Sequence, residues 1–328
     1  MLRRITLVIV PLLLLVTACT QAPQPDSGSS RPSDSASASQ SSSAGSAAPT
    51  SPSATPTPPT TPVHVSLLED DGATFGVGMP IIAWFNRAPT DMTAFSAATT
   101  VTVNGSVVHG GWYFERTLHA GAVFEGHYRL QGYWPGHASI HMDLPVKGLS
   151  AGKGLSFDDS LTLDISTGAA NIATVDAATL RMTVTSDGKP YGTFPVSLGA
   201  ANTPTQRGTK VIMEKGADIP MSGPGYYDPH VQWTQRLTYG GEYLHSAPWN
   251  CVGAAGCTGP QNNIGAASSS NGCTNLRPAD AKQLYDFLRV GDVVLFPNAS
   301  GPMMQLGQGY GDWNVDWATW LTGGLLPV

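Results

Sequence analysis

The alternation of hydrophobic and polar positions along the chain predicts short β-strands over most of its length. Residues 99–103, 127–130 and 161–165 have strand-like patterns, and turn residues at 104–105, 135–136 and 158–159 separate such runs at short intervals. About seven short strands in about a hundred residues are typical of an immunoglobulin-like β-sandwich. We therefore predict a mainly β fold whose first domain, at residues 63–167, is such a sandwich.

A second β-rich pattern begins near residue 171 and predicts another domain, at residues 168–296. Residues 179–184 and 191–198 alternate on either side of Asp187-Gly188. An Asp-Gly pair in this position predicts a type I′ hairpin, because both central residues of that turn need positive φ. Residues 208–214, 232–238 and 242–244 predict further strands. One short helix is predicted to begin at Pro278 and to stop at Gly291, before a buried strand at 292–296.

The candidate catalytic pair is a cysteine and a histidine from separate segments. Cys273 follows Gly272 in a small polar run at residues 268–275, and His245 ends a strand-like run. A free thiol with a pKa of about 8.5 is mostly protonated at neutral pH, so an imidazole that accepts its proton completes the minimum set for thiolate catalysis. Gly272 allows a tight turn whose amides can face an oxyanion. We also expect the helix N-terminus at Pro278 to lie near Cys273 and to favour the thiolate.

The N-terminus predicts an exported lipoprotein. Arg3 and Arg4 precede an apolar run at residues 5–16, which is short for a membrane span of about 20 residues. Residues 16–19 (VTAC) resemble a bacterial lipobox. This implies a signal peptide at residues 1–18, lipid on the Cys19 thiol and anchorage at the outer face of the cytoplasmic membrane; ordinary signal cleavage is the alternative. Residues 19–62 are rich in Ser, Pro, Thr and Ala and predict a disordered tether.

Charge and cysteine content narrow the function further. The net charge is −6 and no basic cluster occurs, so we expect no nucleic-acid partner. His137 and His141 are four residues apart but lie in a strand-like segment without the glutamate of an HExxH motif, so we predict no metal site. Of the four cysteines, three follow Cys19, and this odd number leaves one thiol unpaired in an exported protein.

Ordered segments from residue 174 to the tail resemble a known family. They are residues 203–205 (TPT) with Gly208, 239–249 (YGGEYLHSAPW), 271–275 (NGCTN), 280–286 (DAKQLYD), 291–294 (GDVV) and 312–317 (DWNVDW) with Trp320. The stretch at residues 174–296 resembles the YkuD-type L,D-transpeptidase catalytic domain. The whole folded part resembles the actinobacterial, mycobacterial-type enzymes, which carry one or more immunoglobulin-like domains before the catalytic one.

This resemblance implies a reaction on peptidoglycan, and that reaction needs no cofactor. Such enzymes attack the third residue of a tetrapeptide stem, release D-alanine and form a cysteine thioester. The amine of a diaminopimelate residue in a neighbouring stem then resolves the thioester into a 3→3 cross-link, and carbapenem β-lactams acylate the same cysteine. Attachment of a protein or small amine to the stem, or hydrolysis of such a bond, is the alternative within the same fold.

The resemblance also implies residue roles. Cys273 is the nucleophile, His245 the base and then the acid, and the carbonyl of Ser246 orients the imidazole. The amides of Gly272 and Cys273 are the oxyanion donors. The positions that match substrate contacts or pocket lining are Tyr227, Gly240, Gly241, Asn275, Trp249 and Met213; core packing is the alternative for Tyr227, Met213 and Trp249.

The tail at residues 297–328 contains Trp313, Trp317 and Trp320. Their spacing predicts one helical face packed on a domain. The resemblance implies that this tail folds back toward the immunoglobulin-like domain.

Two departures from the family pattern stand out. Asn271 replaces the histidine that usually precedes Gly-Cys. We expect retained activity, because Asn tolerates unusual φ and both donates and accepts hydrogen bonds; the alternative is a non-catalytic or weakly active cell-envelope binding protein. The segment between His245 and Cys273 is longer than usual, and we hypothesise a Cys251–Cys257 disulfide that ties a loop over the active site, with a zinc site as the alternative.

Overall fold

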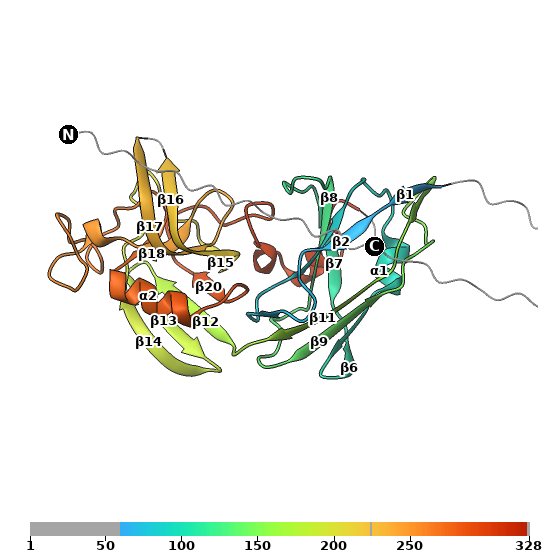
Figure 1. Ribbon diagram of the computed structural model, residues 1–328, viewed down its shortest axis with the longest axis horizontal. Helices are drawn as coiled ribbons and strands as arrows, with labels where there is room; N and C mark the ends of the chain where they lie inside the picture. The colour runs from blue at the N-terminus through green and yellow to red at the C-terminus, as the bar shows by residue number, and fades with distance from the viewer. Residues whose placement is uncertain (1–59, 224, 327–328) are drawn as a thin grey trace, which may run out of the picture. The chain divides into compact units, whose positions relative to one another are not determined.

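The structure is a computed structural model that describes residues 60–223 and 225–326 (Figure 1). The predicted signal peptide, Cys19 and nearly all of the predicted tether lie outside the described residues. Within the described ranges, no helix is long and apolar enough to cross a membrane. The fold is mainly β, as predicted, and the described residues belong to one compact unit.

The first domain is a sandwich of two sheets, as the strand pattern predicts. The five-stranded sheet has the order β3-β11-β9-β5-β6 and the four-stranded sheet the order β2-β4-β8-β7, while β1 pairs with β10. The strands are β1 Thr61–Val63, β2 Val65–Leu67, β3 Thr74–Phe75, β4 Ile81–Phe85, β5 Thr100–Val103, β6 Ser106–Val108, β7 Gly111–Glu115, β8 Phe124–Arg129, β9 Ser139–Leu144, β10 Leu155–Phe157 and β11 Leu161–Thr167.

Period-two burial builds the core between these sheets. Ile81 and Phe85 of β4 are buried in one cluster with Ile140 and Met142 of β9. Burying side chains of this size stabilises the fold by about 1.5–3 kcal/mol each. The short helix α1 (Thr93–Ala98) was not predicted, since it is six residues long and its N-cap makes no side-chain hydrogen bond. Its Phe95 is fully buried in the same cluster, so tertiary packing stabilises this helix.

The second domain contains the other two sheets. One has the order β14-β13-β12-β20-β15 and the other the order β16-β17-β18-β19 (Figure 1). The strands are β12 Asn171–Asp176, β13 Arg181–Ser186, β14 Lys189–Pro195, β15 Gly208–Val211, β16 Glu214–Gly223, β17 Tyr226–Arg236, β18 Tyr243–Ser246, β19 Thr274–Leu276 and β20 Val293–Phe296. Asp187 and Gly188 join β13 to β14 with φ of 49° and 74°, which confirms the predicted I′-type turn.

The predicted helix after the cysteine is α2 (Pro278–Phe287). Pro278 occupies the first turn, where its missing N–H would have no partner in any case. Ala281 and Leu284 are buried in the core of the second domain. The tail forms two short helices, η2 (Asp312–Asn314) and α3 (Trp317–Trp320), so Trp313 belongs to a different helix from Trp317 and Trp320.

The C-terminal tail covers the outer face of the four-stranded sheet. All six residues of β8 are buried: alternate residues face the sandwich core, and Glu125, His127 and Arg129 lie on the opposite face. The Arg129 guanidinium lies 4.9, 5.2 and 4.2 Å from the rings of Trp313, Trp317 and Trp320, respectively. The three tail tryptophans therefore surround one arginine side chain, and cation–π attraction stabilises their contact with it.

A close backbone contact also joins the two domains. The amide of Gly76 donates to the carbonyl of Val290 and the amide of Gly78 to the carbonyl of Gly291, both at 2.8 Å. A Cβ on Gly76 would lie 2.1 Å from the amide nitrogen of Asp292, so this approach requires glycine. The first domain is thereby connected directly to the segment that precedes β20.

Candidate active site

Two neighbouring parallel strands bring the catalytic candidates together. The strands β18 and β19 pair so that Leu244 lies opposite Thr274 and His245 opposite Asn275. Cys273 immediately precedes β19, at the position where β18 begins on its partner strand. Segments that are far apart in the sequence thus place the thiol and the imidazole beside one pocket.

Cys273 is a buried, free cysteine. Its Sγ donates to the carbonyl of Gly241 at 3.4 Å. Burial raises the pKa of the Cys273 thiol to about 12, although the amide of Tyr243 favours the thiolate. The strand β19 lies between Cys273 and the N-terminus of α2 in the chain, and the expected effect of the helix dipole on the thiol stays a prediction. With a pKa this high, the thiol must be activated by removal of its proton at the moment of reaction.

His245 lines the same pocket as Cys273, although no hydrogen bond joins its ring to the thiol among the described residues. Its ring is buried, and Nδ1 lies 2.8 Å from the carbonyl oxygen of Ser246. A carbonyl only accepts, so Nδ1 carries the hydrogen and Nε2 keeps a lone pair. Burial lowers the pKa of His245, which keeps the imidazole neutral at physiological pH. His245 is thus a ready base, and the carbonyl of Ser246 orients it.

The backbone around Cys273 adopts the turn that the glycine permits. Gly272 has a φ of +109°, and its amide donates to Ser270 Oγ at 3.2 Å. Ser270 Oγ in turn donates to the carbonyl of Cys273 at 2.6 Å. Across the described ranges, the Cys273 amide has no hydrogen-bond partner. Of the two amides suggested as oxyanion donors, the one on Cys273 is therefore available, whereas the one on Gly272 is engaged by Ser270.

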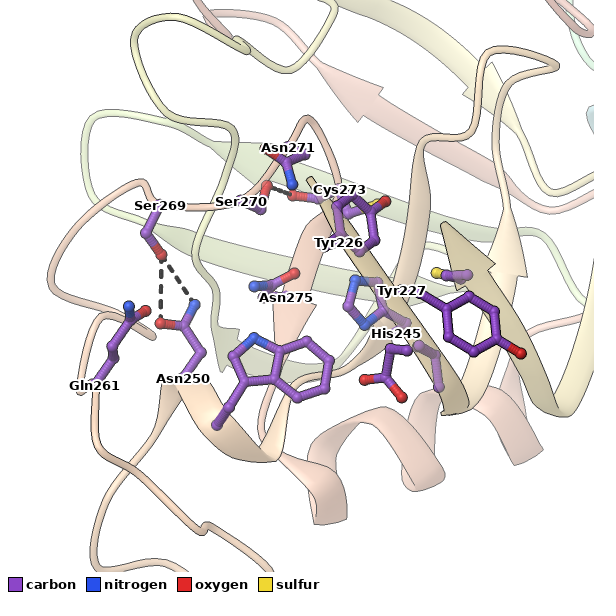
Figure 2. Close-up of a pocket in the computed structure, with 14 residues that line it drawn as sticks. Tyr226, Tyr227, His245, Asn250, Gln261, Ser269, Ser270, Asn271, Cys273 and Asn275 are labelled. Atoms are coloured by element: carbon purple, nitrogen blue, oxygen red, sulfur yellow. Dashed lines mark hydrogen bonds between the residues drawn. The ribbon is translucent and has the colours of Figure 1, made fainter. Parts of the chain in front are cut away.

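The pocket beside this pair has a volume of about 290 Å³ (Figure 2). Residues from the β16–β17 hairpin, from β18 and from the polar segment before Cys273 line it. Among the residues suggested from the sequence, Tyr227, His245, Trp249, Cys273 and Asn275 line this pocket. Asn275 Oδ1 is buried without a hydrogen-bond partner within the described ranges, which makes it a candidate acceptor for a substrate N–H.

Sequence reasoning missed several lining residues. Met221, Tyr226, Asp228 and Val231 come from the β16–β17 hairpin. Met213, which the sequence suggested as lining, instead packs beside the cluster of Met79, Ile82, Val211 and Tyr310. Met213 immediately precedes β16, whereas Met221 lies within β16 opposite Asp228 of β17 and lines the pocket. Alternation within the hairpin was the signal available for Met221.

The glycines suggested as substrate contacts lie in the turn between β17 and β18. Gly240 is exposed, and Gly241 has a φ of +96° and provides the carbonyl that accepts the Cys273 thiol. Neither glycine lines the pocket itself. The turn therefore acts on the cysteine through its backbone.

The long segment between His245 and Cys273 forms one wall of the pocket. Cys251 and Cys257 form a disulfide there, which confirms the pairing predicted from the sequence. Asn250 Nδ2 donates to Ser269 Oγ at 3.0 Å, and both residues line the pocket together with Gln261 (Figure 2). Asn271 is exposed at the pocket, and its side chain makes no hydrogen bond to any described residue.

An ion pair between Lys210 and Glu242 lies beside the segment that contains Cys273. The side chain of Lys210, on β15, is 0% exposed and pairs with Glu242, which is 13% exposed. Glu242 Oε1 also accepts from the amide of Gln206 at 2.8 Å. Thr205 Oγ1 donates to the carbonyl of Gly272 at 2.8 Å. The sequence signal for this support was the TPT segment, but nothing in it indicated Lys210.

The chemistry of the pocket is that of a thiol nucleophile and a base. A cluster of metal-ligating side chains is found elsewhere among the described residues, on the four-stranded sheet of the first domain. The pocket combines a protonated thiol, a neutral imidazole, an available amide and an apolar and aromatic wall. This arrangement can carry out acyl transfer through a covalent intermediate.

Comparison with known proteins agrees with this geometry. Residues 170–295 match the model of the YkuD L,D-transpeptidase catalytic domain, and residues 33–150 match a bacterial Ig domain. L,D-transpeptidase 2 of Mycobacterium tuberculosis is 29% identical over 80% of this chain and 64% of its own length. L,D-transpeptidase 5 of the same species is 32% identical over 78% of this chain and 55% of its own length. The chain therefore spans less than two thirds of these curated relatives.

A solved structure is similar as well. The structure of the L,D-transpeptidase LdtMt1 in complex with imipenem is 26% identical, with a TM-score of 0.55 over 73% of this chain and 99% of that one.

Proposed function

We propose that this chain, which belongs to the L,D-transpeptidase family through its YkuD catalytic domain, forms 3→3 cross-links in peptidoglycan. One observation carries the proposal: Cys273, immediately before β19, and His245, on the neighbouring parallel strand β18, line a single pocket with Asn275. We expect an extended stem peptide to lie along the β16–β17 hairpin, where tyrosine side chains are exposed. Tyr227 is 69% exposed and is free to stack on a bound peptide.

The first half-reaction forms a thioester. His245 Nε2 takes the thiol proton while Sγ of Cys273 attacks the carbonyl carbon of the third stem residue. The developing oxyanion accepts a hydrogen bond from the Cys273 amide. The C–N bond to the terminal D-alanine then breaks, and the imidazolium returns its proton to the leaving amine. Because the thiol now donates to Gly241, it must first rotate away from that carbonyl.

The second half-reaction transfers the acyl group. The side-chain amine of a diaminopimelate residue in a neighbouring stem attacks the thioester and loses a proton to His245. The C–S bond breaks, and the departing sulfur recovers that proton. The enzyme is regenerated, and an amide joins the two stems. No redox or metal chemistry enters these steps.

The test uses the full chain with a carbapenem and an intact-mass measurement. We expect one adduct per chain, absent from Cys273→Ala, followed by a dimeric product and free D-alanine when a tetrapeptide stem replaces the carbapenem. The relative solved with imipenem supports this choice of probe. His245→Gln, which keeps a polar side chain but no base, should slow acylation by about 10²–10⁴-fold.

A non-catalytic envelope-binding role is the second candidate, because two observations favour it. Asn271 stands where the family has histidine, and burial keeps the Cys273 thiol protonated. A folded protein with reduced Cys273 that forms no adduct, yet binds stem peptide, would establish this role. An adduct without cross-linked dimer would point to another acceptor or to hydrolysis.

The anchoring of the enzyme is also proposed. The lipobox-like VTAC segment supports a lipid on Cys19 and retention at the outer face of the cytoplasmic membrane. Partition of the full chain into a detergent phase tests this. Loss of that partition in Cys19→Ala is the expected result, and unchanged partition would contradict it.

A further inference from the structure

Three potential metal ligands converge on the tail-covered face of the first domain. Glu125 and His127 are two residues apart on β8, so their side chains share one face of the sheet. Glu115 on β7 lies directly opposite Glu125, which places it on that face as well. One ligand atom from each of the three side chains lies within 4.8 Å of the others. The strand register places the three side chains on one face, and their rotamers bring the ligand atoms together.

The histidine in this cluster has an unsatisfied nitrogen. The His127 side chain is 3% exposed, and its Nδ1 lies 2.6 Å from Asp312 Oδ1. Its Nε2 points toward the carboxylates but lies 3.6 Å from Glu125 Oε1, beyond hydrogen-bond range. Among the described residues, Nε2 of His127 and Oε1 of Glu115 have no hydrogen-bond partner. Buried polar atoms are normally paired, so these two atoms indicate a missing ligand.

The charge of the surroundings points to a cation. Glu125 and Asp312 are buried and Glu115 is partly buried. Glu69 is buried nearby, but burial raises its pKa to about 8 and the amide of Ile82 donates to it, so it adds little to the negative charge.

Arg129 is the permanent cation on the same face, and the tail tryptophans and the carbonyl of Val315 hold its guanidinium. Buried carboxylates are normally paired with cations or coordinate metals. Although burial opposes it, the negative charge of Asp312 raises the pKa of His127 well above its usual range, so a proton on His127 balances Glu125 when no metal is bound. A divalent ion would take the place of that proton and would neutralise Glu115 as well.

We propose that Glu115, Glu125 and His127 bind a divalent transition-metal ion, with Zn²⁺ as the fitting member of that class. Imidazole nitrogen and carboxylate oxygen are zinc ligands at about 2.0–2.2 Å, so the three atoms need only a small contraction to surround one ion. Asp312 fixes the tautomer by accepting from Nδ1–H, the outer hydrogen bond that metal-bound histidines usually make.

The ion would connect the first domain to the C-terminal tail. Glu115, Glu125 and His127 belong to the sheet, whereas Asp312 belongs to the tail helix η2. None of these residues lines the pocket beside Cys273. The proposed site is therefore structural, and it stabilises the packing of the tail on the sheet without taking part in acyl transfer.

The test measures zinc in the full chain with Cys19→Ser and Cys273→Ser, so that neither thiol can bind the ion. The protein is freed of metal with EDTA, exposed to ZnCl₂, dialysed and analysed by elemental mass spectrometry. We expect one Zn²⁺ per chain, a ligand-field spectrum when Co²⁺ replaces it, and a rise in Tm on the order of 5 °C at a 100-fold excess over Kd. No retained zinc and no change in Tm would overturn the proposal.

Substitutions locate the ion. Glu115→Gln and His127→Gln should each abolish stoichiometric retention, and Asp312→Asn should weaken zinc binding by about 10–100-fold. His141→Gln is the matched control, because that exposed histidine also pairs with an aspartate, Asp164, on the other sheet. Near-UV circular dichroism verifies each fold. If His127→Gln does not fold, Glu115→Gln provides the test, because Glu115 is only partly buried. Full zinc retention in either folded variant would overturn the proposal and would show that His127 is only an imidazolium between two carboxylates.

Discussion

Removal of Lys210 should destabilise the catalytic domain, because it leaves the partly buried carboxylate of Glu242 without its counter-ion. The Lys210 side chain is 0% exposed, and its Nζ lies 4.1 Å from the centroid of the Phe296 ring. Burial lowers the pKa of Lys210, while the negative charge of Glu242 raises it. The pair is therefore electrostatically coupled, and each member depends on the other.

The magnitude follows from the asymmetry of buried ion pairs. Breaking such a pair by removal of one partner costs about 3–5 kcal/mol, whereas removal of both charges is often close to neutral. Lys210→Met keeps an unbranched apolar side chain of similar length but removes the charge that pairs with Glu242 and lies over Phe296, so we expect a loss of about 3 kcal/mol or more. The double variant Lys210→Met/Glu242→Gln keeps an oxygen acceptor for the amide of Gln206. It should lose only about 1 kcal/mol.

Urea unfolding of the wild type, the two single variants and the double variant gives the full cycle. A coupling free energy of about 2 kcal/mol or more between the two sites is the expected result. The reasoning is refuted if Lys210→Met costs less than about 1 kcal/mol, or if the double variant costs the sum of the single ones. The m-values must agree among the variants, because a change in m would mean a change in the unfolded reference.

Three further predictions concern the site and the tail. As the pH is lowered, the rate of Cys273 acylation by a carbapenem should fall only below the ordinary histidine pKa of about 6.5, because burial lowers the pKa of His245. The rate should show no thiol titration near pH 8.5, because burial raises the pKa of Cys273 to about 12. A rate that rises near pH 8.5 would exclude this mechanism. Ser270→Ala should lower stability by about 1–3 kcal/mol in urea unfolding, because it leaves the Gly272 amide unsatisfied, and an unchanged midpoint would contradict that hydrogen bond. Arg129→Met should lower Tm and shift tryptophan fluorescence to the red as the tail separates from the sheet; unchanged emission would show that the three tryptophans pack without it.

The side chain of Asn271 does not hold the turn before Cys273 in place. Asn271 is exposed and makes no hydrogen bond to a described residue, whereas the turn itself is held by Ser270 and by Gly272 with its φ of +109°. The local backbone therefore does not depend on the side chain at position 271.

Local patterns in the sequence determined the strands, the Asp187-Gly188 turn and the helix that begins at Pro278, because these depend on alternation, on positive φ and on the missing amide of proline. They also identified Cys273 and His245, since the chemistry requires those residue types. The local patterns did not show whether Cys273 and His245 are placed to react together.

Only the tertiary structure decided which residues meet. The register of β7 on β8 brings the partly buried Glu115 to the buried Glu125, beside His127. Lys210 becomes a partner of Glu242 because β15 and the turn before β18 pack together. Burial, which raises the pKa of the Cys273 thiol where a helix dipole was expected to lower it, is likewise a property of the assembled fold. A sequence pattern records the period of a strand, but not its neighbours or the depth at which a charge is buried.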